Sequence, residues 1–347
     1  MMTAKETVSR IRCDLDFEAS GRQAAYLRAP LSRNTSGWGA VEIPIVVLKN
    51  GEGPTVLFTG GVHGDEYEGP IAISKLARSL DHGRIQGRVI LMPAVNMPAV
   101  LADTRLSPVD GRDINRCFPG DPRGTFSQIL AHFMDSVILP HVDISVDLHT
   151  AGHSMESALS TNMHYVQDKA LRERTMQIAA AFGAPFNAVF WGVDEGATFT
   201  SCVERRGKIS VGTELGGWGR VNVEGVRIAE RGLSNVLKAC GVLDGLPATT
   251  QRGGASTTRH MMIKDPANFL FSRHTATYEP AHVAGDVVNA GERAGSLHFI
   301  EDLDHDPIDV RYATSGILWM APGPGRVQRG DCIGVVMQDY DPLMAAS

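Results

Sequence analysis

Short runs of β-branched and other apolar residues alternate along this chain with longer stretches of helical period. The apolar runs predict strands over residues 55–59, 88–92, 143–146 and 208–211. Between and after them, apolar residues recur every three or four positions, which predicts helices over 71–80, 126–139, 170–182 and 226–240. Gly241 is placed to end the last of these helices. Alternation of this kind is typical of an α/β fold, a mostly parallel mixed sheet with helices on both faces.

The pattern changes after Leu246. A Gly/Ser/Thr-rich connector over residues 247–258 is followed by brief strand candidates without a helical period, separated by turn signals such as Pro322-Gly-Pro-Gly325. We therefore expect two domains. The larger covers residues 1–250, with its core from about residue 41, and a small all-β domain covers residues 251–347.

Composition narrows the function classes. The chain has 347 residues, 43% of them hydrophobic, and a net charge of −6, which argues against a surface for nucleic acid or for anionic lipid. Its 5 cysteines are odd in number and form no CxxC motif, as expected for reduced thiols in the cytoplasm. No segment approaches the roughly 18 apolar residues of a membrane span, and the first twenty residues carry charges where a signal peptide would be apolar.

Polar residues follow each predicted strand of the larger domain. Because the carboxyl ends of parallel strands share one edge of an open α/β sheet, where ligands bind, we expect these side chains to lie together. They are His63, Glu66, Asn96, His149 and Glu214.

The segment His63-Gly-Asp-Glu66 places an imidazole and a carboxylate three residues apart in a glycine-flanked turn. His149 is the natural third ligand, and two histidines with one carboxylate and an open position form the ligand set of catalytic zinc. The chain contains no HExxH motif, which excludes the helical arrangement of that site. We therefore expect one Zn²⁺ per chain.

Four blocks of sequence resemble the signature motifs of the succinylglutamate desuccinylase and aspartoacylase family, a branch of the zinc carboxypeptidase superfamily. They are Gly61-Val-His-Gly-Asp-Glu66, Asp113-Ile-Asn-Arg-Cys-Phe-Pro-Gly120, Asp147-Leu-His-Thr150 and Gly212-Thr-Glu214. The resemblance extends over roughly residues 41–240, and the β-rich tail fits the family's C-terminal domain. The extended block from His63 to Ile71 and the chain length are most similar to family members that deacetylate N-acetyl-L-2,4-diaminobutyrate in ectoine degradation.

The resemblance implies a role for each matched residue. His63, Glu66 and His149 would hold zinc, and Glu214 would move a proton from water to the leaving amine. Asp147 shares a strand face with His149 and would orient an imidazole. The alternatives are a strand-end Glu214 that is merely solvated and an Asp147 that is an ordinary buried carboxylate at the sheet edge.

The second block implies the substrate contacts. Asn115 and Arg116 resemble the pair that grips the substrate α-carboxylate, for which the planar guanidinium is suited. The family also uses an arginine to stabilise the oxyanion. Arg105 lies ten positions before Asn115 and is favoured for this role over Arg112, which lies three before.

The expected function is that of a zinc-dependent amidohydrolase that deacylates a small N-acyl amino acid, most simply N-acetyl-L-2,4-diaminobutyrate to diaminobutyrate and acetate. Acidic residues near the expected pocket, Glu156, Asp194 and Glu195, precede the basic Arg205 and favour a cationic substrate side chain. The partner is a small molecule rather than nucleic acid or membrane, and the chain is compatible with a homo-oligomer.

Three alternatives remain open. Succinylglutamate desuccinylase or aspartoacylase activity would require an extra basic group for a second carboxylate. A peptide carboxypeptidase is another candidate, although the C-terminal β domain would obstruct long substrates. The third is a metal-binding or regulatory protein without catalysis, against which the presence of both Glu214 and Arg116 argues.

Overall fold

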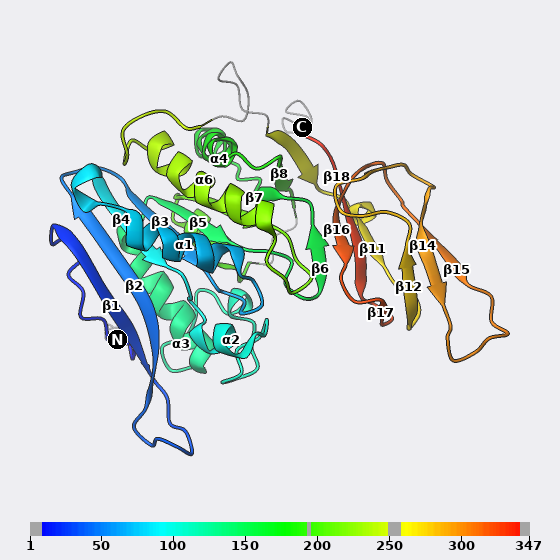
Figure 1. Ribbon diagram of the computed structural model, residues 1–347, viewed down its shortest axis with the longest axis horizontal. Coiled ribbons are helices and arrows are strands. Elements are labelled where there is room, and N and C mark those ends of the chain that lie inside the picture. Colours follow the sequence, from blue (N-terminus) through cyan, green and yellow to red (C-terminus); the bar gives the residue numbers. More distant parts are fainter. Residues whose placement is uncertain (1–8, 193–195, 249–257, 341–347) are drawn as a thin grey trace, which may run out of the picture.

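A long mixed sheet runs through the molecule in the computed structural model, which describes residues 9–192, 196–248 and 258–340 (Figure 1). Its strand order is β1-β2-β4-β3-β5-β9-β7-β8-β10-β18-β16-β13, with β6 paired to β16 and β11 to β18. These strands are β1 (Gly21–Pro30), β2 (Ala40–Asn50), β3 (Thr55–Gly60), β4 (Gly87–Met92), β5 (Ile144–Leu148), β6 (Met155–Ser157), β7 (Ser160–His164), β8 (Phe186–Phe190), β9 (Ile209–Glu214), β10 (Arg259–Ile263), β11 (Phe269–Phe271), β13 (Val287–Val288), β16 (Gly316–Pro322) and β18 (Cys332–Asp339).

The four predicted strands are confirmed as β3, β4, β5 and β9. They lie side by side in the order β4-β3-β5-β9, and all are parallel. Every residue of β3 and β4 is buried, which explains why these runs are apolar on both faces. The carboxyl ends of β3, β5 and β9 therefore meet at one edge of the sheet.

Helices cover both faces of this sheet, as the sequence predicts. One face packs against α1 (Glu68–Ser79), α4 (Lys169–Phe182) and α6 (Val223–Ala239), and the opposite face packs against α3 (Phe126–Phe133) and α5 (Phe199–Arg205). A short helix, α2 (Met97–Ala102), follows β4. Gly241 takes a φ of +75° directly after α6, which fits its predicted role at the end of that helix.

The helix predicted over residues 126–139 is shorter in the structure. It ends at Phe133 and continues as a wider π turn over Met134–Ile138 and a 3-10 turn over Leu139–His141. Pro140 contributes to this change, because it has no backbone N–H to donate to the preceding turn.

The N-terminal hairpin was not predicted, since the sequence indicated a core only from about residue 41. Strands β1 and β2 pair antiparallel over their whole length, and β2 joins the sheet through β4. The side chains of Leu27, Ile43 and Ile45 are fully buried beneath α3. The hairpin therefore extends the core that supports the carboxyl edge of β3.

The C-terminal region is rich in strands and continues the main sheet. Strand β10 pairs parallel with β8, and β18 and β16 follow it. A second sheet has the order β15-β14-β12-β17, with β12 (Ala276–Pro280), β14 (Arg293–His298), β15 (Ile308–Arg311) and β17 (Arg326–Val327). The predicted boundary at residue 250 lies outside the described residues, and the division into two domains stays a prediction.

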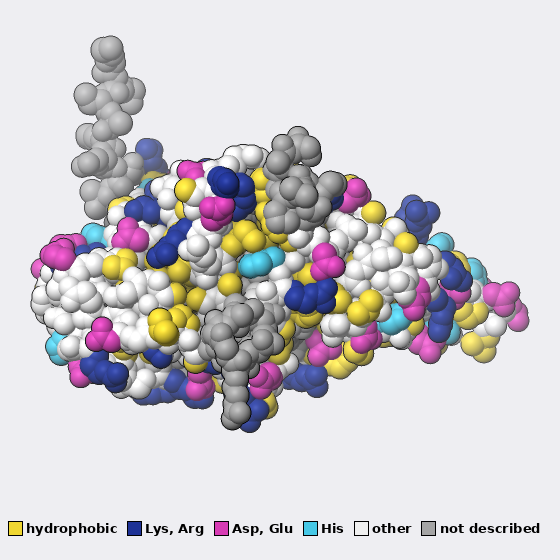
Figure 2. Space-filling model, turned by 90° about the horizontal axis from the view of Figure 1, so that it is seen from above, with side chains coloured by type: hydrophobic (Ala, Val, Ile, Leu, Met, Phe, Trp, Pro, Cys, Tyr) yellow, Lys and Arg dark blue, Asp and Glu magenta, His cyan; other side chains and the backbone are white. Residues whose placement is uncertain are grey.

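The surface carries mixed charge. On the face shown in Figure 2, Lys and Arg side chains are interspersed with Asp and Glu around an apolar central band. All five cysteines are free thiols. Of the helices in the described parts of the chain, none combines the length and apolar character needed to cross a bilayer.

Candidate active site

The turn between β3 and α1 carries the first two site residues. Gly61 adopts a φ of +61°, and a Cβ on Gly64 would overlap the backbone carbonyl of Ala99 in α2, so only glycine fits at both positions. The N–H of Gly64 donates to the carbonyl of Thr104 at 2.9 Å. These close approaches fix the turn and direct His63 and Glu66 toward the edge of the sheet.

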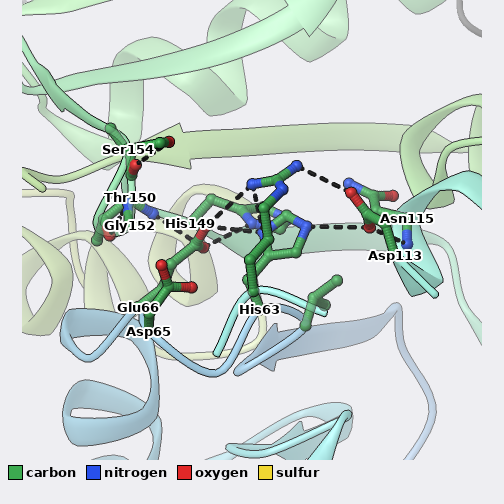
Figure 3. A network of polar contacts seen from close by, with 12 residues as sticks. His63, Asp65, Glu66, Asp113, Asn115, His149, Thr150, Gly152 and Ser154 are labelled. Atoms are coloured by element: carbon green, nitrogen blue, oxygen red, sulfur yellow. Dashed lines mark hydrogen bonds and ion pairs between the residues drawn. The ribbon is translucent and has the colours of Figure 1, made fainter. Parts of the chain in front are cut away.

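The side chains of His63, Glu66 and His149 converge on one point (Figure 3). Nδ1 of His63 lies 2.7 Å from Oε1 of Glu66, and Nδ1 of His149 lies 2.8 Å from Oε2 of Glu66. The three residues are buried, and their potential ligand atoms all lie within 4.8 Å of one another. The structure thus assembles the donor set that the sequence predicts for a metal.

The outer nitrogen of each imidazole is held by an aspartate. Nε2 of His149 lies 2.7 Å from Asp147, and Nε2 of His63 lies 3.2 Å from Asp113. Asp147 also accepts a hydrogen bond from the Thr59 hydroxyl at 2.6 Å. With the proton on Nε2, each Nδ1 lone pair faces the shared centre, which is the arrangement that metal-ligating histidines require.

Charge also favours a cation between these donors. Burial raises the pKa of the Glu66 carboxyl, but the two imidazoles outweigh burial and hold it well below its usual range. Conversely, burial lowers the pKa of His63 and His149, but the surrounding carboxylates outweigh burial, so the pKa of each imidazole is raised above its usual value. An ionised carboxylate between two imidazole nitrogens fits Zn²⁺, which takes such ligands and leaves a position open in catalytic sites.

Glu214, the last residue of β9, faces the same centre. Its Oε2 is buried and has no hydrogen-bond partner among the described residues, although the side chain lines the pocket with Glu66 and His149. Burial and the neighbouring charge of Glu66 raise the pKa of Glu214 to about 8, against the opposing charges of the histidines and Arg105. A buried carboxylate oxygen without a partner is suited to a proton or hydrogen bond that a bound molecule supplies.

The three residues expected to contact substrate also line this pocket. Arg105 donates to Asp113 at 3.0 Å and lies 4.0 Å from Oε1 of Glu66. Asn115 accepts a hydrogen bond from the backbone of Phe199 at 2.8 Å, and Arg116 donates to the carbonyl of Asn115 at 2.9 Å. The structure therefore brings Arg105 to the metal donors, whereas Arg112 is not among the lining residues.

Other sequence expectations do not reach the pocket. Asn96 is buried beside the turn, where its amide donates to the carbonyl of Val62 at 3.3 Å, so it supports the backbone rather than lining the site. Glu156 pairs with Arg220 at 3.3 Å and is not among the lining residues. Asp194 and Glu195 lie outside the described residues.

Several lining residues were missed from the sequence. Asp113, which contacts Nε2 of His63 but is not itself a lining residue, was missed as well, although it lies in the second motif block two positions before Asn115. The far wall is formed by residues of β7, β8 and β16, strands that the sequence did not place beside the metal donors. These wall residues include Asn162, His164, Phe190 and Trp319.

Comparisons with known proteins agree with this geometry. The family model for the succinylglutamate desuccinylase/aspartoacylase catalytic domain matches residues 52–240. Over 338 residues the chain is 38% identical to the N-alpha-acetyl-L-2,4-diaminobutyric acid deacetylase of Halomonas elongata, and the match spans 96% of this chain and 97% of that relative.

Solved structures give the same result. A succinylglutamate desuccinylase/aspartoacylase from Rhodobacter sphaeroides is 66% identical with a TM-score of 0.92, covering 96% of this chain and 100% of that one. The product-bound ectoine utilization protein EutE from Ruegeria pomeroyi is 34% identical with a TM-score of 0.90, covering 95% and 99%. The resemblance of the four motif blocks is thus confirmed, and the chain belongs to the succinylglutamate desuccinylase/aspartoacylase family of amide-bond hydrolases.

Proposed function

We propose that this protein is a zinc-dependent deacetylase that hydrolyses N-acetyl-L-2,4-diaminobutyrate to diaminobutyrate and acetate. The observation that carries the reaction type is the convergence of His63, Glu66 and His149 beside the buried, unpartnered Oε2 of Glu214. The substrate is supported by the similarity to the Halomonas elongata deacetylase and to the ectoine utilization protein.

His63, His149 and Glu66 would together hold one zinc ion per chain. When bound, it polarises the amide carbonyl and lowers the pKa of a water molecule toward about 7. Asp147 and Asp113 keep both imidazoles in the tautomer that presents Nδ1. The imidazole orientation is therefore set before the metal arrives.

The arginines orient the substrate. Arg116 binds its α-carboxylate through the planar guanidinium, and Asn115 contributes an amide donor beside it. Arg105, anchored by Asp113, points its guanidinium at the metal donors, where the amide oxygen gains negative charge as the carbonyl is attacked. The reacting amide is thereby held between Arg105 and Glu214.

Glu214 carries out the proton transfers. Its carboxylate removes a proton from the attacking water as the new C–O bond forms, and it then donates that proton to the amine nitrogen as the C–N bond breaks. The products are acetate and the free amino acid. An internal base with a raised pKa is suited to both steps, because it gains and loses a proton near neutral pH.

The dicarboxylate substrates of the family name are the second candidate. They would need a basic group for the extra carboxylate, but the Arg and Lys side chains among the described lining residues are Arg105, which lies beside Glu66, and Arg116, which is assigned to the α-carboxylate. A regulatory protein without catalysis is disfavoured because Glu214 and Arg116 both line the pocket with the metal donors, and a site without catalysis has no need for a proton shuttle and a carboxylate-binding group together.

The test is a side-by-side assay of the zinc-loaded enzyme with N-acetyl-L-2,4-diaminobutyrate, N-acetylaspartate and N-succinylglutamate. We expect kcat/KM for the first to exceed the other two by at least about tenfold, because a charge left unpaired in the pocket weakens binding of the transition state. Zinc content measured on the same sample controls for metal loss. A preference for either dicarboxylate would transfer the assignment to that activity.

A further inference from the structure

The floor of the active-site pocket runs from Glu214 along strands β9 and β7. Ser160 in β7 is the register partner of Glu214, and Asn162 is the partner of Gly212, so Asn162 lies one step further along this floor. Because side chains alternate along a strand, Asn162 projects on the same face of the sheet as Glu214. Asn162 is half-buried and lines the pocket.

The residues beside Asn162 in the sheet have no polar side chains. Its register partners are Gly212 in β9 and Ala188 in β8. A Cβ on Gly212 would overlap the Asn162 amide, so the amide lies over β9 in the space that this glycine leaves. Within the described parts of the chain, the Asn162 amide has no hydrogen-bond partner. Its donor and acceptor groups are therefore available to a molecule in the pocket.

Two other polar side chains of the lining are already engaged within the protein or lie close to one that is. The hydroxyl of Ser160 accepts a hydrogen bond from Nε1 of Trp319 at 2.8 Å. The hydroxyl of Thr198 accepts one from the backbone N–H of Ser201 at 3.1 Å and so caps α5. A half-buried amide without a partner gives up hydrogen bonds to water, and a bound group that donates to it removes that cost. Asn162 is thus suited to contact a ligand.

Its position matches the length of the proposed substrate. Asn162 is two residues beyond the register partner of Glu214, about 7 Å along the strand at roughly 3.3 Å per residue. In N-acetyl-L-2,4-diaminobutyrate, the reacting amide nitrogen and the side-chain nitrogen are four bonds apart, roughly 5 Å when extended. A substrate whose amide nitrogen lies over Glu214 therefore reaches Asn162 with its side-chain nitrogen.

We propose that the amide oxygen of Asn162 accepts a hydrogen bond from the side-chain ammonium of the substrate and selects N-acyl amino acids with a short cationic side chain. This inference rests on the proposed deacetylase function and assigns recognition of the side chain to one residue. An ammonium group has three donors and no acceptor, which matches the amide oxygen. The carboxylates of Glu214 and of Asp147, which is the other register partner of Gly212, share this face and favour a cation.

The test compares two substrates of similar size in the zinc-loaded enzyme, N-acetyl-L-2,4-diaminobutyrate and N-acetyl-L-2-aminopentanoate, in which a methyl group replaces the ammonium. Asn162→Leu keeps the size of the side chain and removes its hydrogen-bonding groups. We expect the ratio of kcat/KM values, diaminobutyrate over aminopentanoate, to fall by at least about tenfold. The value of kcat/KM for aminopentanoate should not fall by more than about threefold.

Asn162→Asp is the opposite perturbation, because it keeps the size of the side chain and adds a negative charge. We expect the same ratio to rise by at least about threefold, since a hydrogen bond between charged groups is stronger than one to a neutral amide. Asn34→Asp is the matched control, because it adds the same charge at an exposed residue between β1 and β2. It should keep the wild-type ratio.

Three results would overturn the inference. The first is an unchanged ratio in both Asn162 variants, which would leave this residue no part in side-chain recognition. The second is a ratio that falls in Asn162→Asp, which would show that the amide donates to an acceptor on the substrate. The third is a rise in Asn34→Asp equal to that in Asn162→Asp, which would show an effect of overall charge.

Product binding separates this inference from the proposed function. Calorimetry with free diaminobutyrate and 2-aminopentanoate measures ammonium recognition without turnover. A preference for diaminobutyrate that disappears in Asn162→Leu supports the inference even if the N-acetyl compound is not hydrolysed, which would refute the deacetylase assignment alone. A wild-type protein that binds both products equally would refute the inference.

Discussion

Replacing Glu214 with glutamine should move activity and stability in opposite directions. The substitution keeps the shape of the side chain and removes a charge that the fold does not compensate, since Oε2 is buried without a partner in the described structure. If Glu214 is the proton shuttle, kcat falls by roughly two to four orders of magnitude, because the glutamine side chain cannot accept a proton from the attacking water. Zinc content should remain at about one ion per chain, because Glu214 is not among its ligands.

The stability change can be derived from the pKa. A carboxyl raised from its usual value of 4.5 to about 8 favours the folded state most below pH 4.5, and this contribution is lost as the pH rises toward 8. The full shift corresponds to about 5 kcal/mol at alkaline pH and about 3 kcal/mol at pH 7. Part of the Glu214 side chain faces the pocket, where water screens its charge. We therefore expect the free energy of unfolding of Glu214→Gln to exceed that of the wild type by about 1–3 kcal/mol at pH 7.

Thermal unfolding of the chelator-treated protein measures this gain, because zinc would itself compensate the Glu214 charge. With an unfolding entropy of about 2.1 cal/mol/K per residue over 347 residues, the expected rise in Tm is roughly 1.5–4 °C. The difference between variant and wild type should increase from pH 5 to pH 8. A lower Tm for Glu214→Gln at pH 8, or a kcat within tenfold of wild type, would contradict the assignment of Glu214 as a strained catalytic base.

Five further substitutions test the rest of the site. His63→Ala and His149→Ala should each lose zinc and activity together, and elemental analysis that finds full occupancy would contradict the ligand assignment. Asp147→Asn should weaken zinc affinity by about 10–100-fold in a competition titration with a chelator, with the fold retained by circular dichroism. Arg116→Lys should raise KM more than it lowers kcat, because lysine lacks the two parallel donors for a carboxylate. Gly64→Ala should destabilise the protein by several kcal/mol or prevent soluble expression, since its Cβ overlaps the α2 backbone.

The sequence predicts the metal donors well for a physical reason. His63 and Glu66 sit in one turn, His149 follows a fully buried strand, and the carboxyl ends of neighbouring parallel strands necessarily meet. The contact between Asp113 and His63 was harder to predict, because the two residues are 50 positions apart and their contact depends on how the intervening segment folds. The motif block contained Asp113, but nothing in the local pattern pointed its carboxylate at an imidazole.

The wall of the pocket formed by β7 and β8 could not be predicted in the same way. Strand β7 reads Ser-Thr-Asn-Met-His, a largely polar run without the alternation or apolar character that marks a strand. Without β7 and β8, proximity along the chain made Glu156, Asp194 and Glu195 the acidic candidates for the pocket. In the structure Glu156 turns to Arg220, while Glu204, on a helix across the sheet face, approaches the pocket through His164.

The C-terminal strand β16 forms part of the wall of the active site. Nε1 of Trp319 donates to the hydroxyl of Ser160 at 2.8 Å, and Ser160 is the register partner of Glu214, so the wall is anchored directly opposite the proposed base. The Trp319 ring also meets Phe190 edge-on at 5.3 Å, and main-chain pairing of β16 with β6 holds this arrangement. Side-chain and main-chain contacts thus hold this wall together beside the proposed base. We therefore expect the site to favour single N-acyl amino acids over polypeptides, which disfavours a peptide carboxypeptidase activity.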